Sequence, residues 1–73
     1  MKLVFVNGSL MREGETADYE LHNEAITFSF VVNEGACLEI IEFGSEFMKR
    51  DSYTFAQQLD HHTKFVLRGR YPK

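Results

Sequence analysis

The strongest structural pattern in the chain lies in residues 25–43, which read AITFSFVVNEGACLEIIEF. Residues 25–33 alternate as a β-strand does, and one of the two faces carries four bulky apolar side chains: Ile26, Phe28, Phe30 and Val32. We expect this face to lie in the core. Residues 33–35, Asn-Glu-Gly, supply the short glycine-containing connection of a hairpin. The pattern therefore predicts a strand, a turn and a second strand over residues 36–43 that pairs with the first.

This second strand carries apolar side chains on both faces. Leu38 and Ile40 share one face, and Ile41 and Phe43 lie on the opposite face beside polar residues. A strand with two apolar faces is typical of the interior of a sheet. We therefore expect residues 36–43 to form a central strand.

The remaining sequence predicts further strands and one helix. Alternation of apolar and polar side chains predicts strands over residues 2–7, 16–21 and 64–71. Ser45 is placed to cap a single helical turn that reaches Lys49. A longer helix is expected from Tyr53 to about His61, because Phe55 and Leu59 are spaced by one helical turn and would face the sheet.

The predicted fold class is therefore α+β. We expect an antiparallel sheet of four or five strands with one main helix, at about residues 53–61, packed on one of its faces. Residues 1–71 would form a single globular domain, and residues 72–73 a frayed tail. A chain of 73 residues is too short for a second domain or a roomy substrate cavity.

Composition narrows the class of protein. Cys37 is the only cysteine, which excludes an intramolecular disulfide and a zinc site of several cysteines. The apolar run from Leu3 to Val6 is too short for a signal peptide or a membrane span. We interpret Met1 as the native start of a cytoplasmic protein that does not bind membranes.

Charge is unevenly distributed along the chain, although the formal net charge is only −3. The segment from Glu13 to Glu46 contains nine acidic residues and neither lysine nor arginine, whereas the residues after 46 are net basic. If the fold keeps these segments apart, a negative face would steer a basic protein partner. The alternative is that the charges only keep the strands soluble. The basic residues are too few to indicate sequence-specific nucleic-acid binding.

Binding candidates follow from this charge map and from the aromatic content. The acidic candidates begin the segment just described: Glu13, Glu15, Asp18 and Glu20. Large apolar side chains in irregular or acidic surroundings are candidates for exposed anchors of an interface: Tyr19, Phe43, Phe47, Met48 and Tyr53. The alternative for these side chains is a place in the core, covering one end of the sheet. Arg68 and Arg70 are the candidates on a basic strand.

The sequence predicts neither a catalytic residue, nor a metal site, nor a cofactor. His61 and His62 are adjacent on the expected helix, so their side chains point about 100° apart and are badly placed to share an ion. Cys37 lies in an apolar strand, where a thiol is usually a small packed side chain. Glu39 and Glu42 fall on opposite faces of their strand and do not form an acid–base pair.

Residues 3–12, LVFVNGSLMR, resemble the opening strand and substrate loop of γ-glutamyl cyclotransferase-like proteins. In that family a strand enters a Tyr-Gly-Ser/Thr-Leu loop whose backbone helps to hold the carboxylate end of the substrate. Here Asn7 stands at the usual tyrosine, and Glu13 stands where glycine is common. The family has a larger fold with a catalytic glutamate inside a barrel. The resemblance implies a small enzyme of this kind as one alternative.

The whole chain, from Met1 to Lys73, is similar in length, layout and charge segregation to small transcription regulators encoded by lytic phages of Xanthomonas. This resemblance implies a protein that binds the host's RNA polymerase near the N-terminus of the β′ subunit. It also implies inhibition of initiation through displacement of σ, together with antitermination.

Our hypothesis is therefore a regulator in the cytoplasm of a host bacterium that is not an enzyme and acts by occupying a surface of bacterial RNA polymerase. The cyclotransferase-like enzyme is one alternative. A structural subunit that self-associates through strand edges, such as residues 16–21, is the other.

Overall fold

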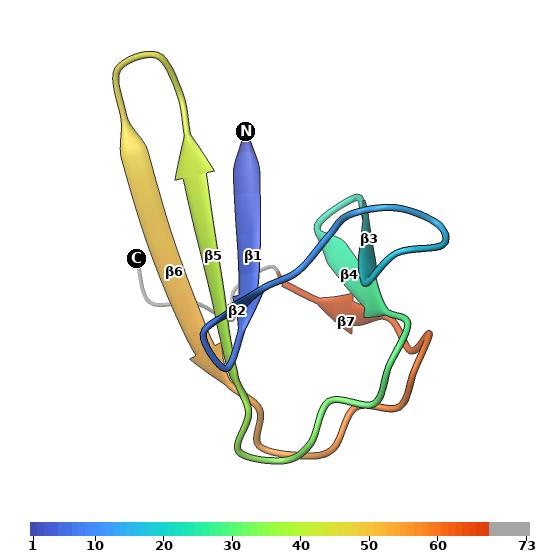
Figure 1. The fold of residues 1–73 in the computed structure, drawn as a ribbon. Helices are drawn as coiled ribbons and strands as arrows, with labels where there is room; N and C mark the ends of the chain where they lie inside the picture. The colour runs from blue at the N-terminus through green and yellow to red at the C-terminus, as the bar shows by residue number, and fades with distance from the viewer. Residues whose placement is uncertain (68–73) are drawn as a thin grey trace.

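The computed structural model describes residues 1–67, and it contains seven β-strands and no helix within that range (Figure 1). The strands are β1 (Lys2–Val6), β2 (Ser9–Leu10), β3 (Tyr19–His22), β4 (Ala25–Phe28), β5 (Cys37–Phe43), β6 (Met48–Thr54) and β7 (Phe65–Val66). The α+β prediction is therefore wrong, and the described chain is all-β. Residues 68–71 of the last predicted strand, with Arg68 and Arg70, and the expected tail at 72–73 lie outside the described residues.

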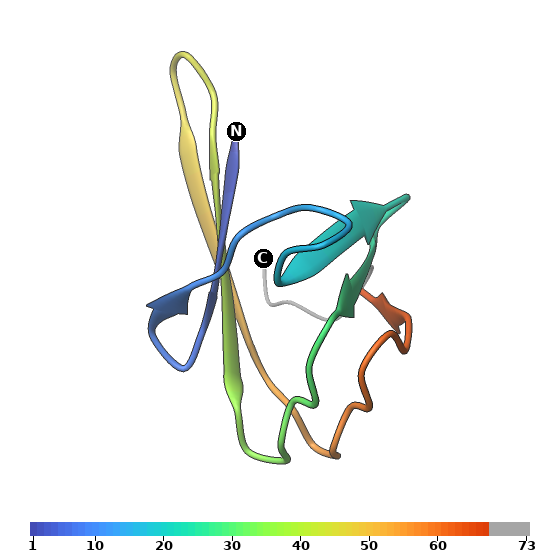
Figure 2. The same cartoon turned by 45° about the vertical axis from the view of Figure 1, so that its right-hand side comes forward.

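The strands form two antiparallel sheets. Sheet A has the order β2-β1-β5-β6, and sheet B has the order β3-β4-β7. Figure 2 shows sheet A nearly edge-on, with sheet B on one side of it. We call the face of sheet A that is turned away from sheet B its outer face. No part of the described chain forms a helix long and apolar enough to cross a membrane.

The segment predicted as a helix, residues 53–61, consists of the last two residues of β6 and an irregular stretch. Tyr53 pairs with Leu38 in the β5–β6 ladder, and the Phe55 N–H donates to the Ala36 carbonyl at 2.9 Å. Leu59 exchanges two backbone hydrogen bonds with Val32. Phe55 and Leu59 are four residues apart, as on one face of a helix, but both side chains reach the core from an irregular segment. Their inward orientation is confirmed: Phe55 is buried, and Leu59 packs against the core.

The helical turn expected over residues 45–49 is also absent. The β5–β6 turn occupies this position, with the Gly44 N–H donating to the Phe47 carbonyl at 2.9 Å, and β6 starts at Met48. In a seven-residue ladder, every second residue of β6 exchanges backbone hydrogen bonds with β5. One isolated helical turn satisfies very few of its backbone groups, so the strand is the more stable arrangement.

The predicted hairpin of residues 25–43 is wrong, although its two strands form. β4 ends at Phe28, and the chain then crosses from sheet B to sheet A through a turn in which the Ala36 N–H donates to the Asn33 carbonyl. β5 lies between β1 and β6 and is central in sheet A, as predicted. Its neighbour β6 follows after a short turn, so this pairing closes a smaller loop than the pairing of β5 with β1.

The first and third predicted strands are confirmed in part. β1 covers residues 2–6 of the predicted 2–7, whereas β3 starts only at Tyr19 because Gly14 and Ala17 close a turn in front of it. Left-handed backbone angles at Asn7 and Gly8, with φ of 52° and 83°, make a tight hairpin turn between β1 and β2. Asn23 and Glu24, with φ of 48° and 68°, form the turn between β3 and β4.

One core fills the space between the two sheets, and Phe28, Ile26, Leu38, Val4 and Val32 are its largest fully buried side chains. Three members of the face predicted for residues 25–33 are therefore confirmed as core, and the fourth, Phe30, packs against the core with its ring centroid 5.2 Å from that of Phe28. Phe55, Phe65 and Tyr53 extend the core as a cluster of aromatic rings.

Two neighbouring valines test this arrangement. Val32 is 1% exposed and Val31 is 42% exposed. We expect Val32→Ala to lower the free energy of unfolding by about 2 kcal/mol, because it removes buried methyl groups and leaves a cavity. Val31→Ala is expected to change it by less than about 0.5 kcal/mol. Urea denaturation followed by circular dichroism measures both, and equal effects would contradict the assignment of the faces.

Candidate functional site

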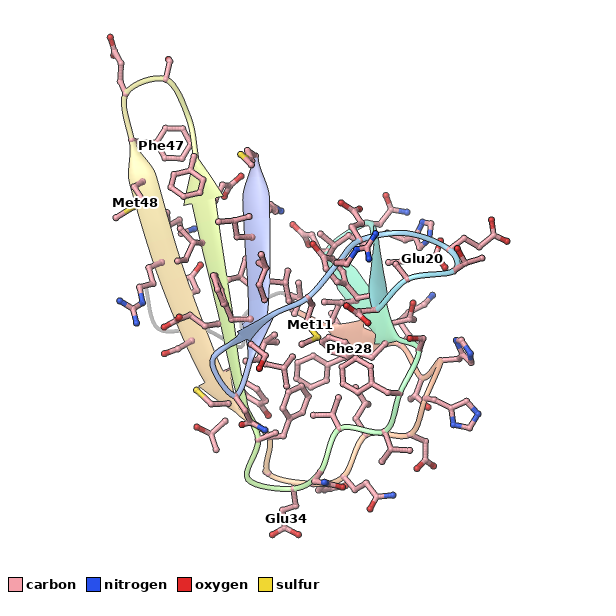
Figure 3. The ribbon with its side chains drawn as sticks, viewed as in Figure 1. Met11, Glu20, Phe28, Glu34, Phe47 and Met48 are labelled. Carbon is pink, nitrogen blue, oxygen red and sulfur yellow. The ribbon has the colours of Figure 1, made fainter. Side chains whose placement is uncertain are left out.

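Five carboxylates lie along β3 and in the segments at its two ends, and we call them the acidic surface: Glu13, Glu15, Asp18, Glu20 and Glu24. They come from the loop before β3, from β3 itself and from the turn into β4. The chain between Glu13 and Glu24 contains neither lysine nor arginine. Glu20 lies opposite Thr27 in the β3–β4 ladder and projects from the side of sheet B away from the core (Figure 3). Four of the five are the predicted acidic candidates.

Backbone hydrogen bonds fix the loop that carries the acidic surface. The Arg12 carbonyl accepts hydrogen bonds from the N–H groups of Asp18 and Tyr19, and the Gly14 N–H donates to the Tyr19 carbonyl. The Asp18 carboxylate in turn accepts a 2.9 Å hydrogen bond from the Arg12 N–H. Asp18 is therefore used to hold the loop, whereas Glu13 and Glu15 are exposed to solvent. The exposed carboxylates are the ones available to a partner.

Tyr19 lies beneath the acidic surface and is only 4% exposed, so its prediction as an exposed anchor is wrong. Alternation along β3 explains this: Glu20 faces outward, so Tyr19 faces the core, where its ring lies 6.4 Å from that of Phe28. Burial raises the pKa of the Tyr19 hydroxyl, and the negative charge of Glu13 raises it further. The charge of Glu13 therefore influences the ionisation of Tyr19, a buried side chain.

The acidic residues of β5 are compensated, in contrast to those of the acidic surface. Glu39 forms an ion pair with Arg50 of β6, and Glu42 lies directly opposite Lys49. Lys49 also pairs with Asp51 at 3.8 Å. Strand pairing brings the basic residues of β6 beside the acidic residues of β5. The negative face predicted from Glu13 to Glu46 is therefore smaller than expected, and the acidic surface is the part of it without lysine or arginine nearby in the sequence.

The remaining apolar candidates lie elsewhere on the molecule. Phe47 and Met48, which are 56% and 67% exposed, occupy the far end of the β5–β6 hairpin (Figure 3). The Phe47 ring packs over Gly44, at which any added side-chain carbon would clash with it. Phe43 is half-buried beside Met48. Tyr53 is half-buried too, with ring centroids 5.5 Å from Phe55 and 5.2 Å from Phe65.

The sequence analysis missed an apolar strip on the outer face of sheet A. The strand registers place six half-buried or exposed side chains there: Leu3, Phe5, Leu10, Ile41, Phe43 and Met48. Their sequence neighbours, such as Val4 and Ile40, face the core. The two apolar faces of residues 36–43 were the available signal, but we interpreted them only as evidence for a central strand. Only the inner face is covered within residues 1–67.

The segment that resembles the cyclotransferase substrate loop has a structural role here. Asn7 and Gly8 form the β1–β2 turn, and the Asn7 side-chain oxygen accepts a 2.9 Å hydrogen bond from the Cys37 N–H. A shallow hollow of about 310 Å³ lies elsewhere and is lined by aromatic, amide and aliphatic side chains: Tyr53, Phe55, Ala56, Gln57, Gln58, Leu59 and Phe65. The structure brings no carboxylate of residues 1–67 into that hollow.

The two adjacent histidines lie in a turn after Leu59, and their ring centroids are 5.2 Å apart. His62 has a left-handed backbone, with φ of 60°. No group of three or more metal-binding side chains gathers within the described part of the chain.

Comparison of the chain with known protein families, with curated protein sequences and with solved structures gave no match.

Glu13 and Tyr19 provide a test of the site's electrostatics. Glu13→Gln should lower the raised Tyr19 pKa part of the way to its ordinary value of 10.0, because burial, the larger cause, remains. Since the folded-state pKa is raised, the stabilisation by Tyr19 is fully present below the unfolded pKa and is lost as pH rises through the folded pKa. Glu13→Gln should therefore make this alkaline loss of stability smaller, because it brings the folded-state pKa closer to the unfolded one.

The measurement is an NMR titration of the Tyr19 ring carbon bonded to oxygen, which separates this residue from the other tyrosines. Glu15→Gln is the matched control, because it removes an equal charge from the same loop. Equal shifts of the Tyr19 pKa in both variants would contradict the specific placement of Glu13.

Proposed function

We propose that the protein is a phage-encoded regulator that binds the RNA polymerase of its host bacterium and is not an enzyme. In this proposal it docks near the N-terminus of the β′ subunit, displaces σ to inhibit initiation, and promotes antitermination. It acts in the host cytoplasm. The resemblance of the whole chain to small phage regulators of transcription supplies the identity of the partner.

The observation that carries the proposal is the exposure of two carboxylates of the acidic surface on a loop of fixed conformation. Exposed carboxylates at Glu13 and Glu15 stand on a loop that backbone hydrogen bonds hold in place. Such a surface attracts a basic segment of a large partner and accelerates encounter, because the Coulomb attraction acts before contact. A pre-formed loop also lowers the entropy that binding has to overcome. A small domain with this surface is suited to occupying a site that another factor needs.

Self-association through residues 16–21, one of the alternatives, receives little support from the edge of β3. The two-residue turn makes His22 and Ala25 a hydrogen-bonded pair, and bonded and non-bonded pairs then alternate along the ladder. The backbone groups of Tyr19 and Leu21 therefore point away from β4. Both backbone groups of Tyr19 already bond to Arg12 and Gly14. Leu21 alone offers a single residue for pairing, which is too short a contact for a stable interface.

Two charge-reversed variants with the same net charge test the proposal. Glu13→Lys combined with Glu15→Lys should weaken binding to purified bacterial RNA polymerase by about tenfold or more at low salt. Glu34→Lys combined with Glu46→Lys is the control, since both glutamates are exposed and lie outside the acidic surface (Glu34 is labelled in Figure 3). The control should bind the polymerase as the unaltered protein does.

Affinity is measured by fluorescence anisotropy of the labelled protein at two salt concentrations, and circular dichroism verifies that each variant is folded. Equal loss in both variants would indicate an effect of net charge alone. Unchanged affinity of the first variant at low salt would contradict a role for the acidic surface.

A further inference from the structure

The free edge of β6 has the structure of a pairing site for an additional strand. β6 forms the outside of sheet A (Figure 1), and within residues 1–67 no strand pairs with its other side. It spans seven residues, whereas the edge strands β2 and β7 span two residues each. The β3 edge is already occupied at Tyr19 by the preceding loop. β6 is therefore the long open edge of the described fold.

The hydrogen-bond pattern identifies which backbone groups of β6 point outward. Gly44 donates to Phe47 at one end of the hairpin, and Phe55 donates to Ala36 at the other. Bonded and non-bonded pairs alternate in an antiparallel ladder, so Lys49, Asp51 and Tyr53 bond to β5. The N–H and C=O groups that point away from β5 are those of the intervening residues: Met48, Arg50, Ser52 and Thr54.

Two copies of the protein are a poor match for each other along this edge. The two-fold register that overlaps all of β6 places Asp51 opposite Asp51 of the second copy. The registers centred on Arg50 or Lys49 likewise place each of these residues opposite itself. Like charges directly opposite destabilise strand pairing. Registers centred on Ser52 or Tyr53 avoid these contacts but leave Met48 and Lys49 unpaired, so a strand of complementary charge is the partner that fits the whole of β6.

We propose that β6 binds an extended segment of another protein as an additional antiparallel strand of sheet A. The segment carries acidic residues opposite Lys49 and Arg50 and a basic residue opposite Asp51. An apolar residue lies opposite Met48, where it continues the apolar strip on the outer face of sheet A. Backbone hydrogen bonds supply affinity, and these side-chain pairs supply specificity.

The test uses a capped peptide, Thr-Val-Thr-Lys-Glu-Glu-Val, which places these partners in antiparallel register. The control peptide, Thr-Val-Thr-Glu-Lys-Lys-Val, exchanges the charges. Amide hydrogen exchange by NMR should show new protection at Met48, Arg50, Ser52 and Thr54 with the first peptide. The amides of Lys49, Asp51 and Tyr53 are already bonded to β5 and should change little. Protection without this alternation, or equal binding of both peptides, would overturn the proposal.

A proline variant tests the same edge independently. Ser52→Pro removes an outward N–H and leaves the hydrogen bonds between β6 and β5, because proline is tolerated at such edge positions. It should lower affinity for the first peptide by about tenfold, whereas Ser52→Ala, which keeps the N–H, should bind as the unaltered protein does. Unchanged binding by a folded Ser52→Pro variant would overturn the proposal. If that variant does not fold, the exchange pattern of the unaltered protein decides.

Discussion

The pairing of β5 with both β1 and β6 is the constraint on which the rest of the structure depends. β5 places Leu38 and Ile40 against sheet B, so its inner face supplies one wall of the core. Its register also brings Glu39 to Arg50 and Glu42 to Lys49. This pairing therefore supplies one wall of the core, brings basic residues beside the acidic residues of β5 and, among residues 1–67, leaves β6 at the edge of sheet A.

Charge neutralisation in sheet A gives the acidic surface its distinct character. Five carboxylates lie from Glu13 to Glu24, where the chain contains neither lysine nor arginine and His22 lies 3.6 Å from Glu20. Asp18 stabilises the loop by accepting a hydrogen bond from the Arg12 N–H. One acidic residue of the acidic surface therefore has a structural role. The two sheets thus separate the β5–β6 hairpin, where Lys49 and Arg50 lie beside the acidic residues of β5, from the acidic surface, which contains neither lysine nor arginine.

Local patterns in the sequence predicted part of this fold, and pairing between distant segments decided the rest. Alternation correctly predicted the buried face of residues 25–33, because successive side chains of an extended chain point to opposite sides. It did not show that β5 pairs with β1 and β6 and not with β4. The spacing of Phe55 and Leu59 predicted a helix. The segment instead follows pairings of Tyr53 with Leu38 and of Leu59 with Val32, which join residues far apart in the sequence and leave no local signal. The acidic residues of the site were predictable from their clustering, whereas the burial of Tyr19 required the register of β3.

The dependence of the association rate on ionic strength tests whether the acidic surface attracts the polymerase before contact. Stopped-flow fluorescence of the unaltered protein with purified bacterial RNA polymerase gives this rate over a series of salt concentrations. Steering by the acidic surface predicts a rate that falls steeply as salt rises, with a smaller change in the dissociation rate. Association that does not vary with salt, or no association at all, would contradict the account.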